Sequence, residues 1–145
     1  MNPPCFSRSE KVRFRDVDGA GIVFYPRFLE MLNNLVEDWF ADELGLPFEE
    51  LHLTHGVPTV DLKVQFRAAA RLGEVLEKRL QVRSLGSSSV DLAFAFHRAD
   101  GSLCLEGEVR LVYVEILEDR KKIRACPIPE TLKKKMENRL MPAQT

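Results

Sequence analysis

The chain has 145 residues, a length that suits one domain with a hydrophobic core. Hydrophobic residues make up 45% and charged residues 30%, which argues against disorder, and the net charge of −1 excludes a basic field that would attract nucleic acid or a membrane. No signal region or membrane-length apolar run is present, and the three cysteines form no CxxC pair, so we expect a cytoplasmic protein with reduced thiols.

The first predicted elements are a short strand over 11–15 and a long helix over about 26–44. Apolar and basic side chains alternate in the strand, which would place Val12 and Phe14 together on a half-buried face. Pro26 occupies a position that favours proline in the first turn of a helix. The helix shows a wide apolar stripe at helical spacing, which indicates that it packs deeply against a sheet.

Four strands are predicted after this helix. A short helix or turn over 46–56 comes first, and the hydrophobic period then changes to two. The connections between the strands are short, and one contains the hairpin signal Asp100-Gly101, so we expect antiparallel neighbours. The four predicted strands are residues 60–67, 74–85, 89–97 and 103–113.

The whole chain, residues 1–145, reads as one domain. A basic C-terminal tail over about 118–145 contains a Pro-x-Pro break and a short terminal helix, and no internal repeat or low-complexity tract is found. One strand, one long helix and four antiparallel strands fit a single curved sheet around the helix. The sequence therefore predicts an α+β domain.

The best candidate for chemistry is the loop within residues 16–25. One interpretation is structural, with Asp16 or Asp18 hydrogen-bonded to local backbone in a strand-to-helix turn. In the functional interpretation, the free N–H groups at the helix start polarise an acyl carbonyl. Gly19 and Gly21 would then leave room for a ligand, and Asp18 would attack the carbonyl or deprotonate a water.

The segment DVDGAGIVFYPRFLEMLNNLVEDWF resembles the first motif of the 4-hydroxybenzoyl-CoA thioesterase family of hotdog-fold enzymes, which includes the Tol–Pal-associated short-chain acyl-CoA thioesterases. The later stretch GVPTVDLKVQFRAAARLGEVL fits the second strand of that family and the following turn. This resemblance, which covers nearly the whole chain, implies a five-stranded antiparallel sheet in the order 1-3-4-5-2 around the helix. It also implies a homodimer or homotetramer with sites at the dimer interface. The motif falls on Asp16, Asp18, Gly21, Val23 and Tyr25.

The resemblance implies an acyl-CoA or aroyl-CoA thioesterase, with Asp18 as the catalytic carboxylate and the backbone N–H of Tyr25 polarising the thioester carbonyl. Phe24 before Tyr25 favours an aroyl substrate, whereas Gly19 stands where the hydroxybenzoyl type has proline. The resemblance places cationic residues near Arg124, where they would bind CoA phosphates. Coenzyme A is part of the substrate, and no other cofactor is expected. Implied contacts to the substrate come from Gly19, Gly21, Val23, Phe24 and Arg124.

Other polar features have a simpler structural interpretation beside the functional one. The connection RSLGSSS, with Arg83, Ser87, Ser88 and Ser89, could reach pantetheine or phosphate, although turn chemistry explains it equally well. Glu30 and Glu37 fit a solvated helix face. His52 and His55 lack a further ligand, so no metal site is expected.

An alternative function is open: a hotdog protein that binds or senses acyl thioesters without turnover, because one fold hosts many functions. The carboxylate of Asp18 distinguishes the two hypotheses, since a sensor would not need it.

Overall fold

A computed structural model describes residues 5–142 of the chain. The elements in chain order are β1 (Phe6–Lys11), the 3₁₀ helix η1 (Phe14–Asp16), α1 (Tyr25–Asp42), α2 (Phe48–Leu51), β2 (His55–Gly56), β3 (Thr59–Phe66), β4 (Val75–Leu85), β5 (Ser89–His97), β6 (Leu103–Val112), β7 (Val114–Leu117), β8 (Lys122–Ala125) and α3 (Glu130–Glu137).

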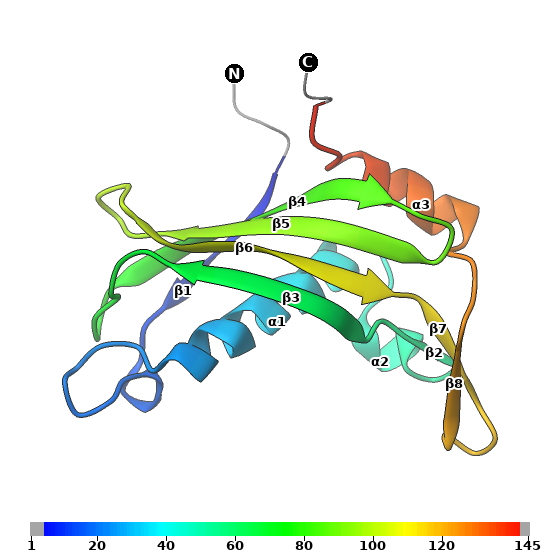
Figure 1. Cartoon of the computed structure of the whole chain (residues 1–145), viewed down its shortest axis with the longest axis horizontal. Helices are drawn as coiled ribbons and strands as arrows, with labels where there is room; N and C mark the ends of the chain where they lie inside the picture. The colour runs from blue at the N-terminus through cyan, green and yellow to red at the C-terminus, as the bar shows by residue number, and fades with distance from the viewer. Residues whose placement is uncertain (1–4, 143–145) are drawn as a thin grey trace.

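Five strands form one antiparallel sheet in the order β1-β4-β5-β6-β3, and this sheet curves over α1 (Figure 1). When these strands are numbered along the chain, the order is 1-3-4-5-2. The predicted α+β class and strand order are therefore confirmed.

The core lies between α1 and the inner face of the sheet. Hydrophobic side chains recur along α1 at helical spacing, so one side of the helix is removed from water, and each fully buried large side chain contributes about 1.5–3 kcal/mol. The indole N–H of Trp39 donates to Glu43 at 2.8 Å, so the largest core side chain has no unsatisfied donor. No helix within residues 5–142 is long and apolar enough to cross a membrane.

The strand predicted over 11–15 is wrong in position. The first strand, β1, ends at Lys11, and Phe14 lies in η1 with 83% of its surface exposed. The carboxylate of Asp16 accepts the backbone N–H of Arg13 at 2.8 Å, which closes a turn there and overrides the alternating pattern. Only Phe6 is buried in β1, so this strand has little hydrophobic signal of its own.

Apolar and polar residues alternate along β3, but this strand lies at the edge of the sheet and is mostly exposed. Leu62 is 38% exposed and Phe66 is 50% exposed. A register shift between Thr59 and Asp61 also takes Val60 out of the alternation. The described chain thus presents an unpaired edge strand with apolar side chains.

A second sheet, β2-β7-β8, was not predicted. The segment expected as a basic tail contains β8 and α3, and β7 and β8 form a hairpin at one end of the molecule (Figure 1). Glu118, Asp119 and Arg120 in the turn of this hairpin have φ values of 50°, 54° and 70°. Turns of this kind usually contain glycine or asparagine, and neither residue occurs at these three positions, so the turn has no local signal in the sequence. The predicted terminal helix is present as α3.

Candidate functional site

The loop between η1 and α1 is closed by its own backbone. The Asp18 N–H donates to the Ile22 carbonyl at 3.0 Å, and the Gly21 N–H donates to the Asp18 carbonyl at 3.0 Å. Gly21 has a φ of 76°, in the left-handed region that favours glycine. The glycine is therefore needed to return the chain toward α1 after Asp18.

Contacts to the segment before β4 hold the same loop from outside. The Val23 N–H donates to the Ala70 carbonyl at 2.9 Å, and the Leu72 N–H donates to the Gly21 carbonyl at 3.2 Å. Two backbone hydrogen bonds thus hold the end of the loop that contains Asp18 against residues 70–72, which are distant in sequence. It is positioned by the fold rather than left to move freely.

The two aspartates have different environments. Asp16 is only 5% exposed, and its Oδ2 accepts the Arg13 N–H, so this carboxylate has a structural role. Asp18 is exposed, and its Oδ1 accepts the Ala20 N–H at 2.8 Å. Within residues 5–142 its Oδ2 has no hydrogen-bond donor. Asp18 is the carboxylate that a ligand can reach.

The first turn of α1 supplies a backbone donor. Phe24 is the extended residue before the helix and provides no side-chain cap, and Pro26 has no N–H. The N–H of Tyr25 has no acceptor among residues 5–142. No acidic side chain lies in the first turn, so the positive end of the helix dipole is not neutralised locally. An acyl oxygen placed there would be polarised.

Aromatic rings surround this helix start. The ring centroids of Phe24 and Tyr25 are 5.4 Å apart, and those of Tyr25 and Phe66 are 6.3 Å apart. All three rings are at least half exposed, and the Phe66 ring also lies 6.0 Å from that of Phe28. Phe66, the last residue of β3, lies in a predicted strand but was not among the predicted site residues.

An apolar groove of about 430 Å³ lies between α1, β3 and the β7–β8 hairpin. Leu29, Leu32 and Val36 line it, and they follow Tyr25 at i+4, i+7 and i+11, on the same side of the helix. Leu62 of β3 and Ile123 of β8 line the other walls. The groove offers a surface for an apolar group, and Tyr25 is not among the residues that line it. The sequence analysis assigned no binding role to these three helix residues.

The remaining predicted contact residues lie at the other end of the molecule. The β4–β5 turn and β8 are opposite the loop before α1 (Figure 1). Carbonyls of Ser87 and Ser88 accept N–H groups of Ile128 and Tyr113 at 2.9 and 2.7 Å, so this turn supports the C-terminal segment. The Arg124 guanidinium is paired with the Glu115 carboxylate within the hairpin. One chain does not bring Arg83, Ser87, Ser88, Ser89 and Arg124 to Asp18.

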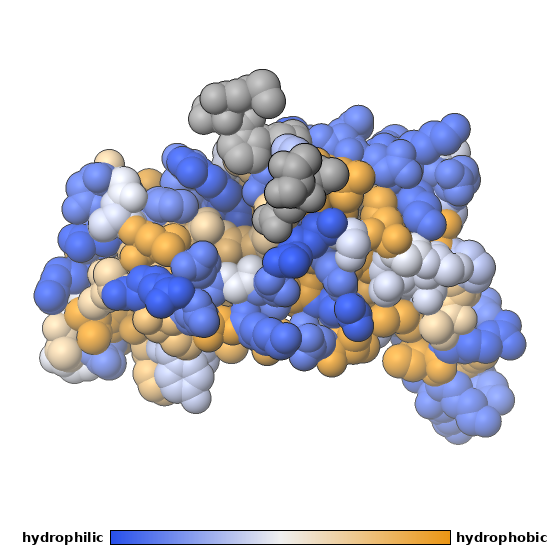
Figure 2. All heavy atoms as spheres, turned by 45° about the horizontal axis from the view of Figure 1, so that its top comes forward, coloured by the Kyte–Doolittle hydropathy of each residue, from blue (hydrophilic) through white to orange (hydrophobic). Residues whose placement is uncertain are grey.

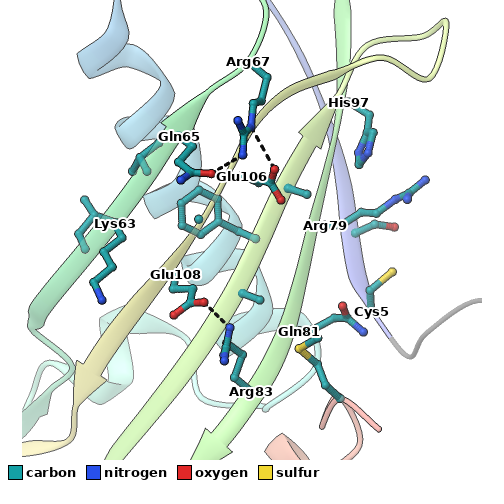
Figure 3. Close-up of a pocket in the computed structure, with 18 of the residues that line it drawn as sticks. Cys5, Lys63, Gln65, Arg67, Arg79, Gln81, Arg83, His97, Glu106 and Glu108 are labelled. Carbon is teal, nitrogen blue, oxygen red and sulfur yellow. Dashed lines mark hydrogen bonds and ion pairs between the residues drawn. The ribbon is translucent and has the colours of Figure 1, made fainter. Parts of the chain in front are cut away.

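A hollow of about 1150 Å³ lies on the sheet face away from α1 and does not include Asp18 (Figure 3). Its walls are charged pairs, such as Arg67 with Glu106 at 3.2 Å and Arg83 with Glu108. Ala93 and Ala95 line it between these long side chains. Hydrophilic side chains predominate over this face (Figure 2). Most of its charged side chains are paired in this way, although Lys63 has no ion-pair partner within residues 5–142.

Residues 12–136 match the family model of the Thioesterase-like superfamily. The chain belongs to this superfamily. A 1,4-dihydroxy-2-naphthoyl-CoA hydrolase of Thermosynechococcus vestitus is 24% identical over 135 residues, which are 91% of this chain and 89% of that protein. A second hydrolase with this name, from Synechocystis, is 25% identical over 126 residues, which are 86% of this chain and 89% of that protein.

Solved structures of the superfamily have the same fold. The 4-hydroxybenzoyl-CoA thioesterase of Pseudomonas has a TM-score of 0.81 and 21% identity, and the match covers 91% of this chain and 99% of that chain. A gentisyl-coenzyme A thioesterase has a TM-score of 0.80 and 27% identity, covering 90% of this chain and 99% of that chain. The predicted hotdog fold and family are confirmed, and the enzyme class of thioester hydrolase is confirmed at the level of the superfamily.

Proposed function

We propose that the protein hydrolyses acyl-CoA or aroyl-CoA thioesters to the free acid and coenzyme A. Membership of the superfamily and the names of its relatives support this activity. The observation on which the proposal rests is the exposed Asp18 carboxylate on a backbone-fixed loop that leads into a helix with an unpartnered first N–H at Tyr25.

In the proposed reaction, the thioester carbonyl oxygen accepts the Tyr25 N–H, and the helix dipole stabilises the oxyanion that forms. Asp18 acts in one of two ways. It attacks the carbonyl carbon, expels the CoA thiolate and forms a mixed anhydride that water then cleaves. Alternatively, it deprotonates a water that attacks the same carbon, and the thiolate leaves from the tetrahedral intermediate. Because thiolate is a good leaving group, neither route needs a dedicated general acid.

We also propose that Gly19, Gly21 and Val23 line the approach to the thioester, since backbone without bulky side chains lets a ligand come close. Phe24 and Phe66 supply flat apolar surface beside the reacting carbon, which favours an aromatic acyl group. The relatives named for naphthoyl and gentisyl substrates agree with an aroyl-CoA substrate.

The complete site is proposed to form in a dimer. The edge strand β3 exposes apolar side chains, and pairing with β3 of a second copy would cover them. Such a two-fold arrangement could bring Arg83, Ser87, Ser88, Ser89 and Arg124 of one copy toward the Asp18 loop of the other. The role of Arg124 in phosphate binding stays a prediction.

The test is release of free thiol from a panel of aroyl-CoA and aliphatic acyl-CoA thioesters. We expect turnover, with the aroyl thioesters favoured in kcat/KM. Binding of these thioesters without thiol release from any of them would favour the alternative, a non-catalytic protein that binds or senses acyl thioesters.

A further inference from the structure

His52 directly follows α2 and is one of the few polar residues that line the apolar groove. Its Nδ1 lies 3.0 Å from the carbonyl oxygen of Phe48. Because a carbonyl oxygen only accepts hydrogen bonds, Nδ1 is the nitrogen that bears the hydrogen in the neutral ring. The ring also packs edge-on against that of Phe48, with centroids 4.9 Å apart. These two contacts hold the ring in one orientation, in which Nε2 is a hydrogen-bond acceptor.

The Nε2 atom of His52 has no donor within residues 5–142. A Cβ on Gly56, which also lines the groove, would lie 3.8 Å from this nitrogen and 3.6 Å from the Val114 side chain. Nε2 therefore lies over the bare backbone of Gly56, beside the apolar side chains of the groove. A hydroxyl group on a ligand in the groove would be the matching donor.

Two other polar side chains line the groove, namely Asn33 of α1 and Thr59 of β3. An amide and a hydroxyl group each donate and accept, so both residues can adapt to a donor or an acceptor on a ligand. In neutral His52 the only N–H is bonded to backbone, so the free nitrogen can only accept. His52 is thus the side chain of the groove that distinguishes a ligand with a hydroxyl group from one without it.

In the proposed dimer, the groove of one copy comes close to the Asp18 loop of the other. β3 runs from Thr59 to Phe66, so antiparallel pairing along its whole length about a two-fold axis places Thr59 of one copy opposite Phe66 of the other. Thr59 lines the groove, and the Phe66 ring lies 6.3 Å from the ring of Tyr25 at the start of α1. This pairing brings the groove to a helix start that does not line it within one chain.

We propose that the groove of one copy binds the acyl group of a thioester held at Asp18 of the other copy, and that His52 is a specificity-determining residue. Its Nε2 accepts a hydrogen bond from a hydroxyl group on the acyl group. This inference rests on the proposed function, because it assumes a thioester at Asp18. The groove volume of about 430 Å³ lies within the range of small-molecule sites, roughly 300–1,000 Å³. Apolar walls suit an aromatic ring, and its hydroxyl group needs one polar partner.

The first test compares 3- and 4-hydroxybenzoyl-CoA with benzoyl-CoA. In the unmodified protein, we expect the better hydroxylated thioester to exceed benzoyl-CoA roughly tenfold in kcat/KM. His52→Phe, which keeps a flat ring without an acceptor, should reduce this ratio to about 1 or 2, and His52→Gln, whose amide oxygen accepts, should restore part of it. The matched control is His55→Phe, because His55 stacks on Tyr113 with ring centroids 4.9 Å apart and does not line the groove. Its ratio should equal that of the unmodified protein.

A second test asks whether His52 and Asp18 of one site come from different chains. Chains with His52→Phe are mixed with an excess of chains with Asp18→Asn, so that nearly every His52→Phe chain is in a mixed dimer. The only Asp18 carboxylate of such a dimer belongs to the His52→Phe chain, and the only His52 belongs to the Asp18→Asn chain. We expect the roughly tenfold hydroxyl preference to return. If His52 served the Asp18 of its own chain, the preference would stay lost.

Three outcomes would overturn the proposal: the unmodified protein shows no hydroxyl preference, His52→Phe keeps the preference, or the mixed dimers do not regain it. Loss of the preference in Asn33→Ala but not in His52→Phe would assign the recognition to α1 instead. Failure of the proposed function gives a different result, because no thioester of either kind would then release thiol. In that case calorimetric Kd values for the same thioesters test His52, and equal values in His52→Phe and the unmodified protein would exclude its role.

Discussion

The ammonium group of Lys78 donates a 3.0 Å hydrogen bond to the backbone carbonyl of Met31 in α1. Lys78 is 1% exposed on the inner face of β4, and it also bonds Glu10 of β1 at 2.6 Å. One buried cation therefore ties the long helix to two strands of the sheet. Because α1 begins with the candidate oxyanion donor, this contact helps to fix the position of that donor.

We expect Glu10→Gln to lower the free energy of unfolding by about 3 kcal/mol, because the buried ammonium would lose its counter-ion. Lys78→Met should cost less, because an aliphatic chain of similar length fills the site and Glu10, with 22% of its side chain exposed, can be hydrated. Urea denaturation at fixed protein concentration measures both changes. If Lys78→Met lowered the free energy of unfolding more than Glu10→Gln, an unpaired Lys78 ammonium would not be the more destabilising of the two changes.

Gly107 lets β3 approach β6. A Cβ at this position would lie 2.0 Å from the Lys63 carbonyl oxygen and 2.7 Å from the Phe94 ring. Gly107→Ala should therefore destabilise the protein by about 3 kcal/mol or more. Gly19→Ala is the control, because nothing lies within 4 Å of its added Cβ. Thermal unfolding should separate the two variants, and equal melting temperatures would contradict the close approach of β3.

Acid should weaken the ion pair between Glu43, which directly follows α1, and Arg139, which lies two residues after α3. Burial opposes ionisation of Glu43, but hydrogen bonds from Arg139 and Trp39 outweigh it and lower the pKa of Glu43 below its usual 4.5. A lowered folded-state pKa contributes stability above the unfolded value, and this contribution is lost as the pH falls through the folded value. Melting temperatures between about pH 6 and about pH 3 should fall less steeply in Glu43→Gln than in the unmodified protein. Parallel pH profiles would exclude this contribution.

The exposed apolar side chains of β3 predict at least a dimer. The mass of one chain is 16.6 kDa, so light scattering at micromolar concentration should give twice that mass or more. Leu62→Lys, which places a charge on the exposed edge, should shift the population toward the single chain. A single-chain mass for the unmodified protein would contradict the edge pairing.

Patterns in the sequence predicted the fold well where periodicity was strong. The helix expected over 26–44 corresponds to α1, and β5, with four buried apolar residues, was placed at 89–97. Positions that break the pattern were missed. Lys78 occupies an inward position where a hydrophobic residue is expected, because its charge is satisfied by partners distant in sequence. The β7–β8 hairpin turns through left-handed residues without glycine, so it left no local signal.

Only the part of the candidate site that is contiguous in sequence could be predicted. The residues from Asp18 to Tyr25 are adjacent in sequence, and the structure keeps them together around the start of α1. The contribution of Phe66 depends on strand pairing and could not be inferred from spacing alone. Arg124 was expected near the substrate, but its distance from the Asp18 loop within one chain follows from the sheet topology (Figure 1).

The rate of thiol release by Asp18→Asn, measured with the best thioester of the panel, tests the catalytic role of Asp18 directly. Asparagine keeps the shape of the side chain and can still accept the Ala20 N–H, so the loop should fold as before, but it is neither a carboxylate nucleophile nor a base. Asp16→Ala serves as the comparison, because loss of its bond to the Arg13 N–H should cost about 1 kcal/mol of stability. We expect the kcat of Asp18→Asn to be at least roughly 100-fold lower, with an unchanged melting temperature. A kcat within a few-fold of the unmodified protein would contradict it.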